Sequence, residues 1–558
     1  MRDRVDDVTR ASARLLPQLQ LWRPGIFLVA ILFSLPIFTI VSFLLHPAND
    51  IWQHLLDTVL GEYLLNSALL VVGVGIGTLV IGVGCAWLTS LCVFPGKRLF
   101  AWALLMPLAF PGYIIAYTYT GMFDFAGPVQ SLLRELGGWG FRDYYFPEIR
   151  SLGGAITMFT LVLYPYVYLL ARAAFLEQSV CVLEVSRTLG CSVWSSFYRV
   201  ALPLARPAIV AGLSLALMET LADYGMVSFF GLSVFTTGIF RTWFGLGDAA
   251  AAAKLASILL LFVFTLVVIE RWSRKRAQYH HSSNRYSVLP QYRLRGYRAW
   301  LAFLACLLPL FFGFVLPAGQ LTVWALQTYR HMVDASFLAL TLNSILLAAS
   351  AAVLAVVLAL FLAYGKRQFR GPLVTASIRV VATGYAIPGT VVAVGVIIPL
   401  AWFDNRVDSW MSDHFDVSTG LLLSGSLFAL MFAYMVRFLA ISVQSVESGL
   451  GKIRQSMDDA ARSLAYTPAQ ILLRVHMPLM KATVLTAFLI VFVDVMKELP
   501  ATLILRPFDF NTLAVRAFEL AGDERLADSS TAALMIVAVG LVPVLLLSRS
   551  IATARAGS

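Results

Sequence analysis

Long apolar runs recur along the whole chain, and they constrain its fold more than any other feature of the sequence. Each run is long enough to cross roughly 30 Å of hydrocarbon as a helix, which takes about 20 residues. With 59% hydrophobic and 13% charged residues, the chain has too little polar surface for a soluble protein of 558 residues. We therefore predict an all-α polytopic membrane protein with about twelve spanning helices in two six-helix halves. The predicted spans are 25–46, 63–92, 99–121, 151–175, 207–230 and 249–270, then 300–325, 337–364, 373–401, 419–441, 481–503 and 528–549.

Lys and Arg residues gather in alternate loops, which predicts the orientation of the chain. They are frequent in the N-terminal tail, in the segment 271–299, and in the short turns at Lys97-Arg98 and Lys366-Arg367. Because cationic loops stay on the cytoplasmic side, we place these segments and both termini in the cytoplasm. The net charge of +11 then reflects topology, and no nucleic-acid partner is expected, because such a partner needs a soluble basic face.

Two of the predicted cytoplasmic loops carry the same residue pattern, 275 positions apart (184 and 459), with the same internal spacing. Such self-similarity indicates an internal duplication. We predict a first half at 1–270 with its loop near 176–206, a cytoplasmic linker at 271–299, and a second half at 300–558 with its loop near 445–480. The first copy runs Glu184-Val185-Ser186, Gly190 and Val200-Ala201-Leu202-Pro203, and the second runs Asp459-Ala460-Ala461, Ala465 and Val475-His476-Met477-Pro478.

The repeat extends into the predicted spans. Pro111-Gly112 falls in the third span and Pro388-Gly389 in the ninth, 277 positions apart (111 and 388). Proline removes a backbone hydrogen bond and kinks a spanning helix, and neighbouring helices or water must then satisfy the freed carbonyl. We expect these duplicated kinks to lie around a shared cavity.

Each patterned loop is predicted to form two short helices that meet at a break. Gly190 can adopt the left-handed conformation that ends the first helix. In the second copy Thr467 can cap the next helix, with Pro468 at its first position and Gln470 three residues after the cap. Ala465 replaces the glycine there, so this corner is either strained by about 1 kcal/mol or built differently. We expect a rigid helical knob on the cytoplasmic face.

The two loops resemble the Glu-Ala-Ala, Gly, Ile-x-Leu-Pro signature of permease subunits of ABC importers. In that family the loop forms a coupling helix that docks on a cytoplasmic ATPase. The first copy departs from the signature at Val185, Ser186 and Val200, and the second at Asp459, Ala465, Val475 and Met477. The resemblance assigns ATPase coupling to Glu184, Gly190, Leu202 and Pro203, and to Asp459, Ala460, Ala461, Ala465 and Pro478.

The ATPase is expected to be a separate subunit. No G-x-x-x-x-G-K-[ST] motif occurs in the sequence, so this chain has no phosphate-binding loop of that kind. The resemblance implies a dimer of ABC ATPase subunits as the partner that uses ATP, while this chain binds no cofactor. It is then a transport subunit and not an enzyme.

A closer resemblance covers most of the chain and suggests the cargo. It implies the type I importer permease fold, with both halves in one chain, in the inner membrane of a bacterium and surrounded by membrane lipid. It also implies that a periplasmic binding protein delivers ferric iron. The segments similar to fused permeases of ferric-iron ABC importers are Phe123–Gln130, Phe146–Ala155, Glu219–Gly225, Phe235–Gly245 and Met496–Phe508.

Four acidic residues near the fifth and eleventh spans form two pairs, Glu219 with Asp223 and Asp494 with Glu498, again 275 positions apart. Residues four apart share a helix face. A carboxylate at the bilayer centre costs about 3 kcal/mol, so we expect all four to face a cavity. Carboxylate oxygens suit a hard trivalent cation, and Tyr224 adds a further oxygen.

Two interpretations of these carboxylates stay open. In the first they line the iron pathway together with Tyr224 and Lys497, where the lysine charge lowers cation affinity, so that iron contact is transient and no stable metal site forms. In the second they are fixed ion-pair partners of Lys497, Arg241 and Arg516.

Alternatives to ferric iron also remain at this stage. The chain could be an ABC permease for another small solute, such as thiamine, sulfate or a polyamine. A secondary transporter would use the membrane carboxylates as an ion relay, but it does not account for the paired loops. A membrane enzyme is disfavoured, because the sequence shows no metal-spaced His/Cys set or nucleophile constellation.

The outward segments 122–150, 231–248 and 504–527 carry both signs of charge, which fits docking of a soluble partner.

Overall fold

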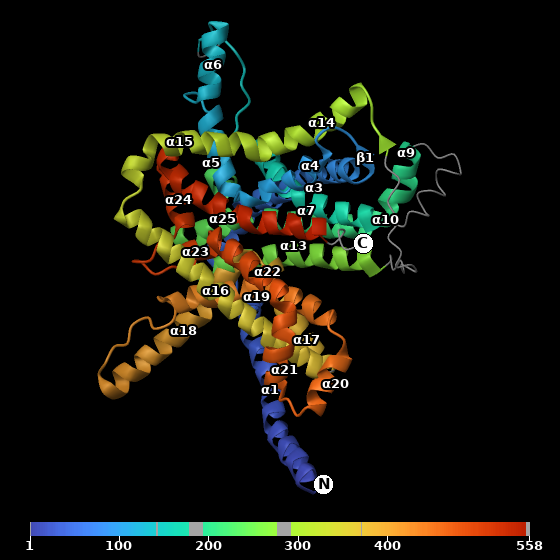
Figure 1. Ribbon diagram of the computed structural model, residues 1–558. Helices are drawn as coiled ribbons and strands as arrows, with labels where there is room; N and C mark the ends of the chain where they lie inside the picture. The colour runs from blue at the N-terminus through green and yellow to red at the C-terminus, as the bar shows by residue number, and fades with distance from the viewer. Residues whose placement is uncertain (1, 141–142, 178–192, 276–291, 370, 554–558) are drawn as a thin grey trace. The chain divides into compact units, whose positions relative to one another are not determined.

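The computed structural model describes residues 2–140, 143–177, 193–275, 292–369 and 371–553 (Figure 1). In these residues the chain is built from helices, apart from two strands of two residues each. The strands β1 (Cys92–Val93) and β2 (Tyr292–Arg293) pair in parallel. The predicted all-α class is confirmed.

The number of spans agrees with the prediction. Eleven helices of the described chain are long and apolar enough to cross a membrane. A twelfth span results if Lys97–Ala109 and Gly112–Gly137 are taken together, although these segments are bent by 92°. The bend falls at Pro111-Gly112, as predicted, because Pro111 cannot donate the backbone hydrogen bond that would continue a helix.

The predicted bounds of several spans are wrong. The ninth span begins at Gly389, after the Pro388-Gly389 break, and extends to Phe415. The helices of the fifth and eleventh spans end at Ala222 and Met496, earlier than the hydrophobic runs do. Short helices follow both of these ends, so the predicted fifth and eleventh spans are interrupted.

The described chain divides into two compact units that do not coincide with the sequence halves. Unit 1 comprises residues 1–46 and 340–512, and unit 2 comprises 47–339 and 513–558. The first helix therefore belongs to the unit built on the second half. The last helix belongs to the unit built on the first half, so each half contributes terminal elements to the other unit.

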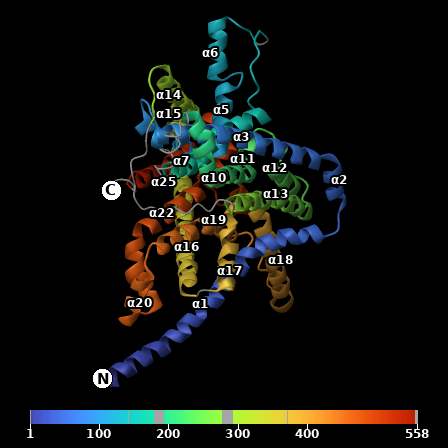
Figure 2. The ribbon, with the colours of Figure 1, turned by 90° about the vertical axis from the view of Figure 1, so that its right-hand side faces the viewer.

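In unit 1, the long helix α1 packs along α17 and α18 (Figure 2). The backbone oxygen of Pro36 would lie 2.6 Å from a Cβ atom at Gly395, so α1 and α18 approach closely at a glycine. Trp22 adds edge contacts to the rings of Phe361 and Tyr364 on α16. The helices are α1 (Arg2–Ser42), α16 (Ala335–Gln368, the first five residues of which belong to unit 2), α17 (Pro372–Ala382), α18 (Gly389–Phe415), α19 (Leu427–Gly451), α20 (Gln455–Ser463), α21 (Pro468–Ile471), α22 (Met477–Met496) and α23 (Pro500–Leu505).

Unit 2 is organised around α3 and α7, which pack against each other over most of their length. Gly77 and Gly82 of α3 face Thr160 and Val167 of α7, and a Cβ atom at either glycine would lie within 2.4 to 2.7 Å of those side chains. Small residues thus permit close approach without a polar contact. The helices are α2 (Asp50–Thr58), α3 (Leu60–Leu91), α4 (Lys97–Ala103), α5 (Gly112–Phe123), α6 (Pro128–Gly137), α7 (Leu152–Glu177), α9 (Val193–Ser196), α10 (Leu202–Ala222), α11 (Gly225–Phe229), α12 (Phe235–Phe240), α13 (Ala249–Lys275), α14 (Tyr297–Leu310), α15 (Leu316–Met332), α24 (Leu513–Gly522) and α25 (Leu526–Thr553).

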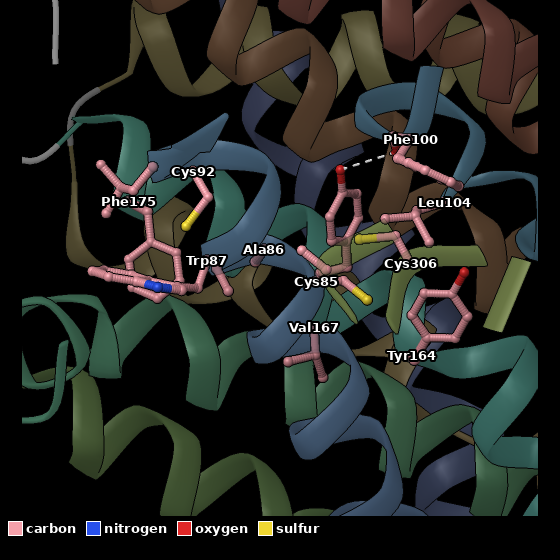
Figure 3. Close-up of a cluster of buried hydrophobic side chains, with 14 of the residues drawn as sticks. Cys85, Ala86, Trp87, Cys92, Phe100, Leu104, Tyr164, Val167, Phe175 and Cys306 are labelled. Atoms are coloured by element: carbon pink, nitrogen blue, oxygen red, sulfur yellow. Dashed lines mark hydrogen bonds between the residues drawn. The ribbon is translucent and has the colours of Figure 1, made fainter. Parts of the chain in front are cut away.

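A buried cluster joins the ends of α3, α7 and α14 in unit 2 (Figure 3). Trp87 contacts the rings of Phe175 and Phe197 at centroid distances of 5.7 and 4.7 Å. The Tyr168 hydroxyl donates to the backbone oxygen of Ala101 at 3.0 Å, so the cluster also fixes α4. Cys85 and Cys306 are buried free thiols within it.

Candidate functional site

The second patterned loop folds into the two short helices predicted for it. Helix α20 ends in a turn in which Tyr466 N–H donates to the Ala461 oxygen and Ala465 N–H to the Arg462 oxygen. This pair of bonds is a Schellman motif. Helix α21 then starts with a capping box, because Thr467 Oγ1 accepts from Gln470 N and Gln470 Oε1 accepts from Thr467 N.

The corner between α20 and α21 is strained rather than built differently. Ala465 has φ of 60°, in the left-handed region that favours glycine, and a Cβ atom there costs about 1 kcal/mol. The capping bonds on both sides hold the residue in this conformation. Glu184 and Gly190 of the first copy lie outside the described residues.

The predicted coupling residues of the second copy differ in their exposure to solvent. Asp459 and Ala460 are exposed, Ala461 is buried, and Ala465 is exposed at the corner. Met457 and Leu464 are also exposed, at 41% and 71% of their surface, so the knob presents apolar side chains beside charge.

A buried polar cluster fastens the inner face of α20. Asp458 has 1% of its side chain exposed and accepts from Arg367 Nε of α16 at 2.7 Å. Its other oxygen lies 2.6 Å from Nε2 of His476, which has a fully buried side chain. Arg367 also donates to the backbone oxygens of Leu450 and Ile453, at 2.6 and 3.0 Å, so that it caps the end of α19.

The charge state of this cluster follows from its contacts. Burial alone would raise the pKa of Asp458, but the hydrogen bonds from Arg367 and His476 outweigh burial and hold the pKa below its ordinary value. Asp458 is therefore a carboxylate at neutral pH and can only accept, so we assign the proton of the shared hydrogen bond to His476 Nε2. The sequence gives no signal for this cluster, because its members are not arranged in any local pattern.

Both copies of the loop end in a π-helical turn. The turns are Phe197–Ala201 and Leu472–His476, at the same 275-residue offset as the loop pattern (197 and 472). The N–H of Leu202 bonds to the Phe197 oxygen, and the N–H of Met477 bonds to the Leu472 oxygen. Pro203 and Pro478 follow at once and have no N–H to donate, which explains why an α-helical bond is replaced at this point.

The acidic residues of the fifth and eleventh spans lie at helix breaks. Asp223 follows the last residue of α10 and has an extended conformation, and Glu498 lies between α22 and α23. The expectation that Glu219 with Asp223, and Asp494 with Glu498, share one face of a continuous helix is therefore wrong. The hydrophobic runs continue past these residues, but the helices end, and Asp223 and Glu498 cap the short helices that follow.

In unit 2, Asp223 caps the short helix α11. Its Oδ1 accepts from Met226 N at 2.8 Å, and its backbone oxygen accepts from Thr236 Oγ1 at 2.8 Å. A Cβ atom at Gly112, where the bent span restarts, would lie 2.8 Å from Asp223 Oδ2. Tyr224 stacks on Phe240 at a centroid distance of 3.7 Å. Glu219 is half-buried in the last turn of α10.

In unit 1, Glu498 occupies the position that corresponds to Asp223. Its carboxylate accepts from Ala501 N and Thr502 N, both at 3.0 Å, and caps α23. A Cβ atom at Gly389 would lie 2.7 Å from Glu498 Oε1, just as Gly112 faces Asp223. In each half, therefore, a carboxylate packs against the glycine of the Pro-Gly break in the same half.

The ion pairs of unit 1 only partly match the expected set. Lys497 is confirmed as a partner of Asp494, at 2.9 Å. Glu498, however, pairs with Arg437 of α19 at 3.2 Å, and this arginine was absent from the sequence analysis. Both side chains of that pair are buried. In unit 2, Arg241 donates to Ser233 Oγ at 3.4 Å and interacts with the Tyr63 hydroxyl.

The described residues of segment 122–150 in unit 2, which is predicted to face outward, are held together by hydrogen bonds. Arg134 of α6 donates to the Phe125 backbone oxygen at 2.9 Å and to the Tyr144 hydroxyl at 3.1 Å. The segment encloses a cavity of about 290 Å³, whose lining includes Asp124, Glu148 and Arg150. It thus offers a structured surface with charges of both signs. Among the residues that the structure describes, no group of three or more His, Cys, Asp or Glu side chains is placed to hold a metal ion.

Comparisons with known proteins identify relatives of the whole chain and of its halves. No protein-family model matches the sequence. The chain is 27% identical over 500 residues to the Fe(3+)-transport system permease protein FbpB 2 of Haemophilus influenzae, covering 88% of this chain and 90% of that protein. It is 25% identical to the ferric transport system permease protein FbpB of Actinobacillus pleuropneumoniae, over 79% of this chain and 64% of the relative.

A half-length relative gives the same picture. The molybdenum transport system permease protein ModB of Escherichia coli is 28% identical over 206 residues, which is 35% of this chain and 87% of that protein. A single permease of that length thus corresponds to part of this chain, as a duplicated polypeptide requires. The resemblance inferred from the loops and segments is confirmed, and the chain is a multi-pass ABC-importer permease, a transport subunit and not an enzyme, with two permease halves in one polypeptide.

Proposed function

We propose that this chain is the membrane permease of an ATP-driven importer that translocates ferric iron delivered by a periplasmic binding protein. The observation that carries the proposal is the match to the ferric permease of Haemophilus influenzae across 88% of the chain. Matches to the molybdenum and sulfate permeases ModB and CysT of Escherichia coli cover only 35% and 27%. The ferric permease aligns with both halves of this chain in one match, whereas those shorter permeases align with part of it, and this similarity favours iron.

The proposal includes the membrane and the partners. The chain lies in the inner membrane of a bacterium with both termini in the cytoplasm, because the basic segments gather on that face. A dimer of separate ABC ATPase subunits docks on the two patterned loops and uses the ATP, and this chain binds no cofactor. The exposed apolar side chains of Met457 and Leu464 beside Asp459 support such docking in the second loop.

The binding protein docks on the outward segments, of which the folded segment around α6 is the best defined. Its arginine, Arg134, is held by three hydrogen bonds and lies over the Phe125 ring at 4.1 Å, so the surface is preorganised. A preorganised loop loses little conformational freedom when a partner binds. Mixed charge on it provides orientation rather than strong affinity.

Iron passes without a stable site. We propose transient contacts with Glu219, Asp223 and Tyr224 in one half and with Asp494 and Glu498 in the other, where Lys497 keeps affinity low. Asp494 already pairs with Lys497, and Glu498 with Arg437, so a cation that approaches must compete with a bound ammonium or guanidinium group. Weak contacts suit a pathway, because a tight site would retain the ion.

The test is reconstitution of the chain with its ATPase in proteoliposomes. ATP hydrolysis and solute uptake are measured with a panel of binding proteins loaded with ferric iron, molybdate, sulfate, thiamine or a polyamine. Stimulation and uptake with the iron-loaded protein are expected. If only another loaded binding protein stimulates ATP hydrolysis and uptake, the proposed cargo is wrong but the permease assignment stands. Uptake that follows an ion gradient without ATP would refute the ABC mechanism for this chain.

A further inference from the structure

We propose that Asp458 is a positioning residue that fastens the second coupling loop to the membrane helices. This inference rests on the proposed function, because it concerns how motion of an ATPase reaches the membrane domain. It assigns a role to a buried cluster outside the predicted coupling residues. The cluster consists of Asp458, Arg367 and His476, and we refer to it as the α20 clamp.

The α20 clamp connects four helices at one point. Asp458 belongs to α20, Arg367 to the last turn of α16, and His476 to the π-helical turn that leads into α22. Arg367 adds the end of α19 through the backbone oxygens of Leu450 and Ile453. A push on α20 is therefore transmitted to α16, α19 and α22 through hydrogen bonds of 2.6 to 3.0 Å.

Burial makes these contacts stiff. The side chains of Asp458 and His476 are 1% and 0% exposed, and that of Arg367 is 15% exposed. Charged hydrogen bonds shielded from water are strong, and breaking one leaves a buried charge without its partner. The exposed pair on the same helix, between Asp459 and Arg462, has side chains 63% and 46% exposed and cannot provide comparable rigidity.

The first copy of the loop carries different residues at the clamp positions. At the 275-residue offset, Asp458 corresponds to Leu183 and His476 corresponds to Ala201. Leucine and alanine cannot form the charged hydrogen bonds that the clamp uses. The duplication has thus kept the docking pattern in both loops and placed the buried acid and histidine in one of them.

The arrangement assigns separate tasks to neighbouring residues on α20. Asp459 and Ala460 face outward, toward a docking partner, while Asp458 and Ala461 face inward. Docking and transmission can therefore be separated by substitution. Asp458→Asn keeps the size of the side chain and removes the charge that holds Arg367 and His476 in place.

The experiment compares Asp458→Asn and His476→Ala with Glu447→Gln in the full complex. Glu447 forms a half-exposed pair with Lys366 between α19 and α16 at the same end of unit 1, so it is a matched control for loss of an ion pair. We expect both clamp variants to retain ATPase binding and ATP hydrolysis while uptake per ATP falls about tenfold, a typical size for coupling between distant sites. Glu447→Gln should leave this ratio unchanged.

A second readout does not depend on the cargo. Spin labels at Ser463→Cys on α20 and Leu479→Cys on α22, in an otherwise cysteine-free chain, report the distance between the two helices. With Asp458 present the distance distribution should be narrow and should not change when a non-hydrolysable ATP analogue is added to the complex. In Asp458→Asn it should broaden.

The outcomes separate this proposal from the function it rests on. If wild-type protein takes up no iron, the proposed cargo fails, while the label distances still test the clamp. The clamp proposal is overturned if Asp458→Asn keeps a narrow distribution, if its uptake per ATP matches wild type although its melting temperature falls, or if it simply releases the ATPase.

Discussion

At the scale of single residues, this protein places strain and buried charge next to the surface that is proposed to bind the ATPase. Ala465 adopts a glycine conformation at the corner of the knob, and Asp458 is buried one position before the exposed Asp459. Both features concern α20, and both are held by hydrogen bonds to neighbouring elements. Their energetic consequences can be measured separately.

The strain at Ala465 should be relieved by glycine. We expect Ala465→Gly to stabilise the fold by up to about 1 kcal/mol, because the left-handed conformation then has no Cβ penalty. Ala465→Val should destabilise it, because a β-branched side chain is worse in this region. Thermal unfolding of the purified permease in detergent measures both. Equal melting temperatures for the alanine and glycine proteins would show that the corner is not strained.

The α20 clamp should make stability depend on pH in the acid range. The pKa of Asp458 is below its ordinary value in the folded protein, so its contribution is fully present above the pKa of the unfolded chain, about 3.9. That contribution is lost as the pH falls through the lower folded value. Melting temperatures of wild type and Asp458→Asn should therefore differ by a constant amount above about pH 5 and converge below about pH 4. A difference that grows on acidification would contradict this assignment.

At the scale of helices, the chain uses duplicated interruptions. Pro-Gly breaks begin α5 and α18, π-helical turns precede α10 and α22, and carboxylates cap α11 and α23. Each pair recurs at nearly the same offset, so the interruptions belong to the repeat unit. The side chains around these interruptions differ between the copies. Corresponding positions in the two halves are therefore held by different interactions.

The two loops should couple the ATPase to transport. We expect Glu184→Lys or Asp459→Lys to weaken ATPase association or to uncouple hydrolysis from uptake, because a cation replaces an acidic group in a docking helix. Membrane insertion should be normal. Co-purification of the ATPase and uptake per ATP are the measurements. Normal transport by both variants with the ATPase still bound would remove the coupling assignment.

Substitution of the two capping carboxylates should lower the stability of the protein by different amounts but reduce iron uptake in both cases. Glu498→Gln removes the negative charge that pairs with the buried Arg437 and should cost about 3 kcal/mol or more. Asp223→Asn keeps a side-chain acceptor for the cap and should cost about 1 kcal/mol or less. If both line the iron pathway, each should reduce iron uptake while basal ATP hydrolysis continues.

A double variant carrying Asp223→Asn and Glu498→Gln decides between the two interpretations. Strongly reduced uptake per folded molecule supports transient iron contact. Reduced thermal stability with normal uptake per folded molecule would leave only the structural role. The measurement therefore needs folded protein to be quantified in each sample, by fluorescence-detected size exclusion, before uptake is compared.

At the scale of the whole molecule, the two halves of the sequence are not the two compact units. Unit 1 takes the first helix from the first half, and unit 2 takes α14, α15, α24 and α25 from the second. Exchange of terminal helices makes each unit depend on both halves.

The orientation of the molecule can be tested with single cysteines. In a cysteine-free chain, Gly137→Cys in the outward segment and Ser283→Cys in the linker should label from opposite sides of the membrane, because basic loops stay inside. An impermeant maleimide applied to intact spheroplasts should label only position 137. Labelling of both positions would overturn the assignment of the cytoplasmic face.

The sequence by itself determined the features that depend on local composition and spacing. Apolar runs gave the helical membrane class and the number of spans, because the length of a spanning helix is set by the bilayer. The repeated pattern located both loops, and Thr467 with Gln470 predicted a cap that the structure contains. These features depend on residues a few positions apart, which a single sequence displays directly.

Only the tertiary structure decided how the charged residues are used. Glu498 pairs with Arg437, 61 positions away, and Asp458 pairs with Arg367, 91 positions away. No periodicity links such residues, because the contact is made by helices that meet in space. The same reason explains the error at Asp223 and Glu498. The apolar run continues, but the helix ends earlier than hydrophobicity indicates, and the carboxylate at this point caps the next helix and packs against a glycine more than 100 positions away (112 and 223, 389 and 498).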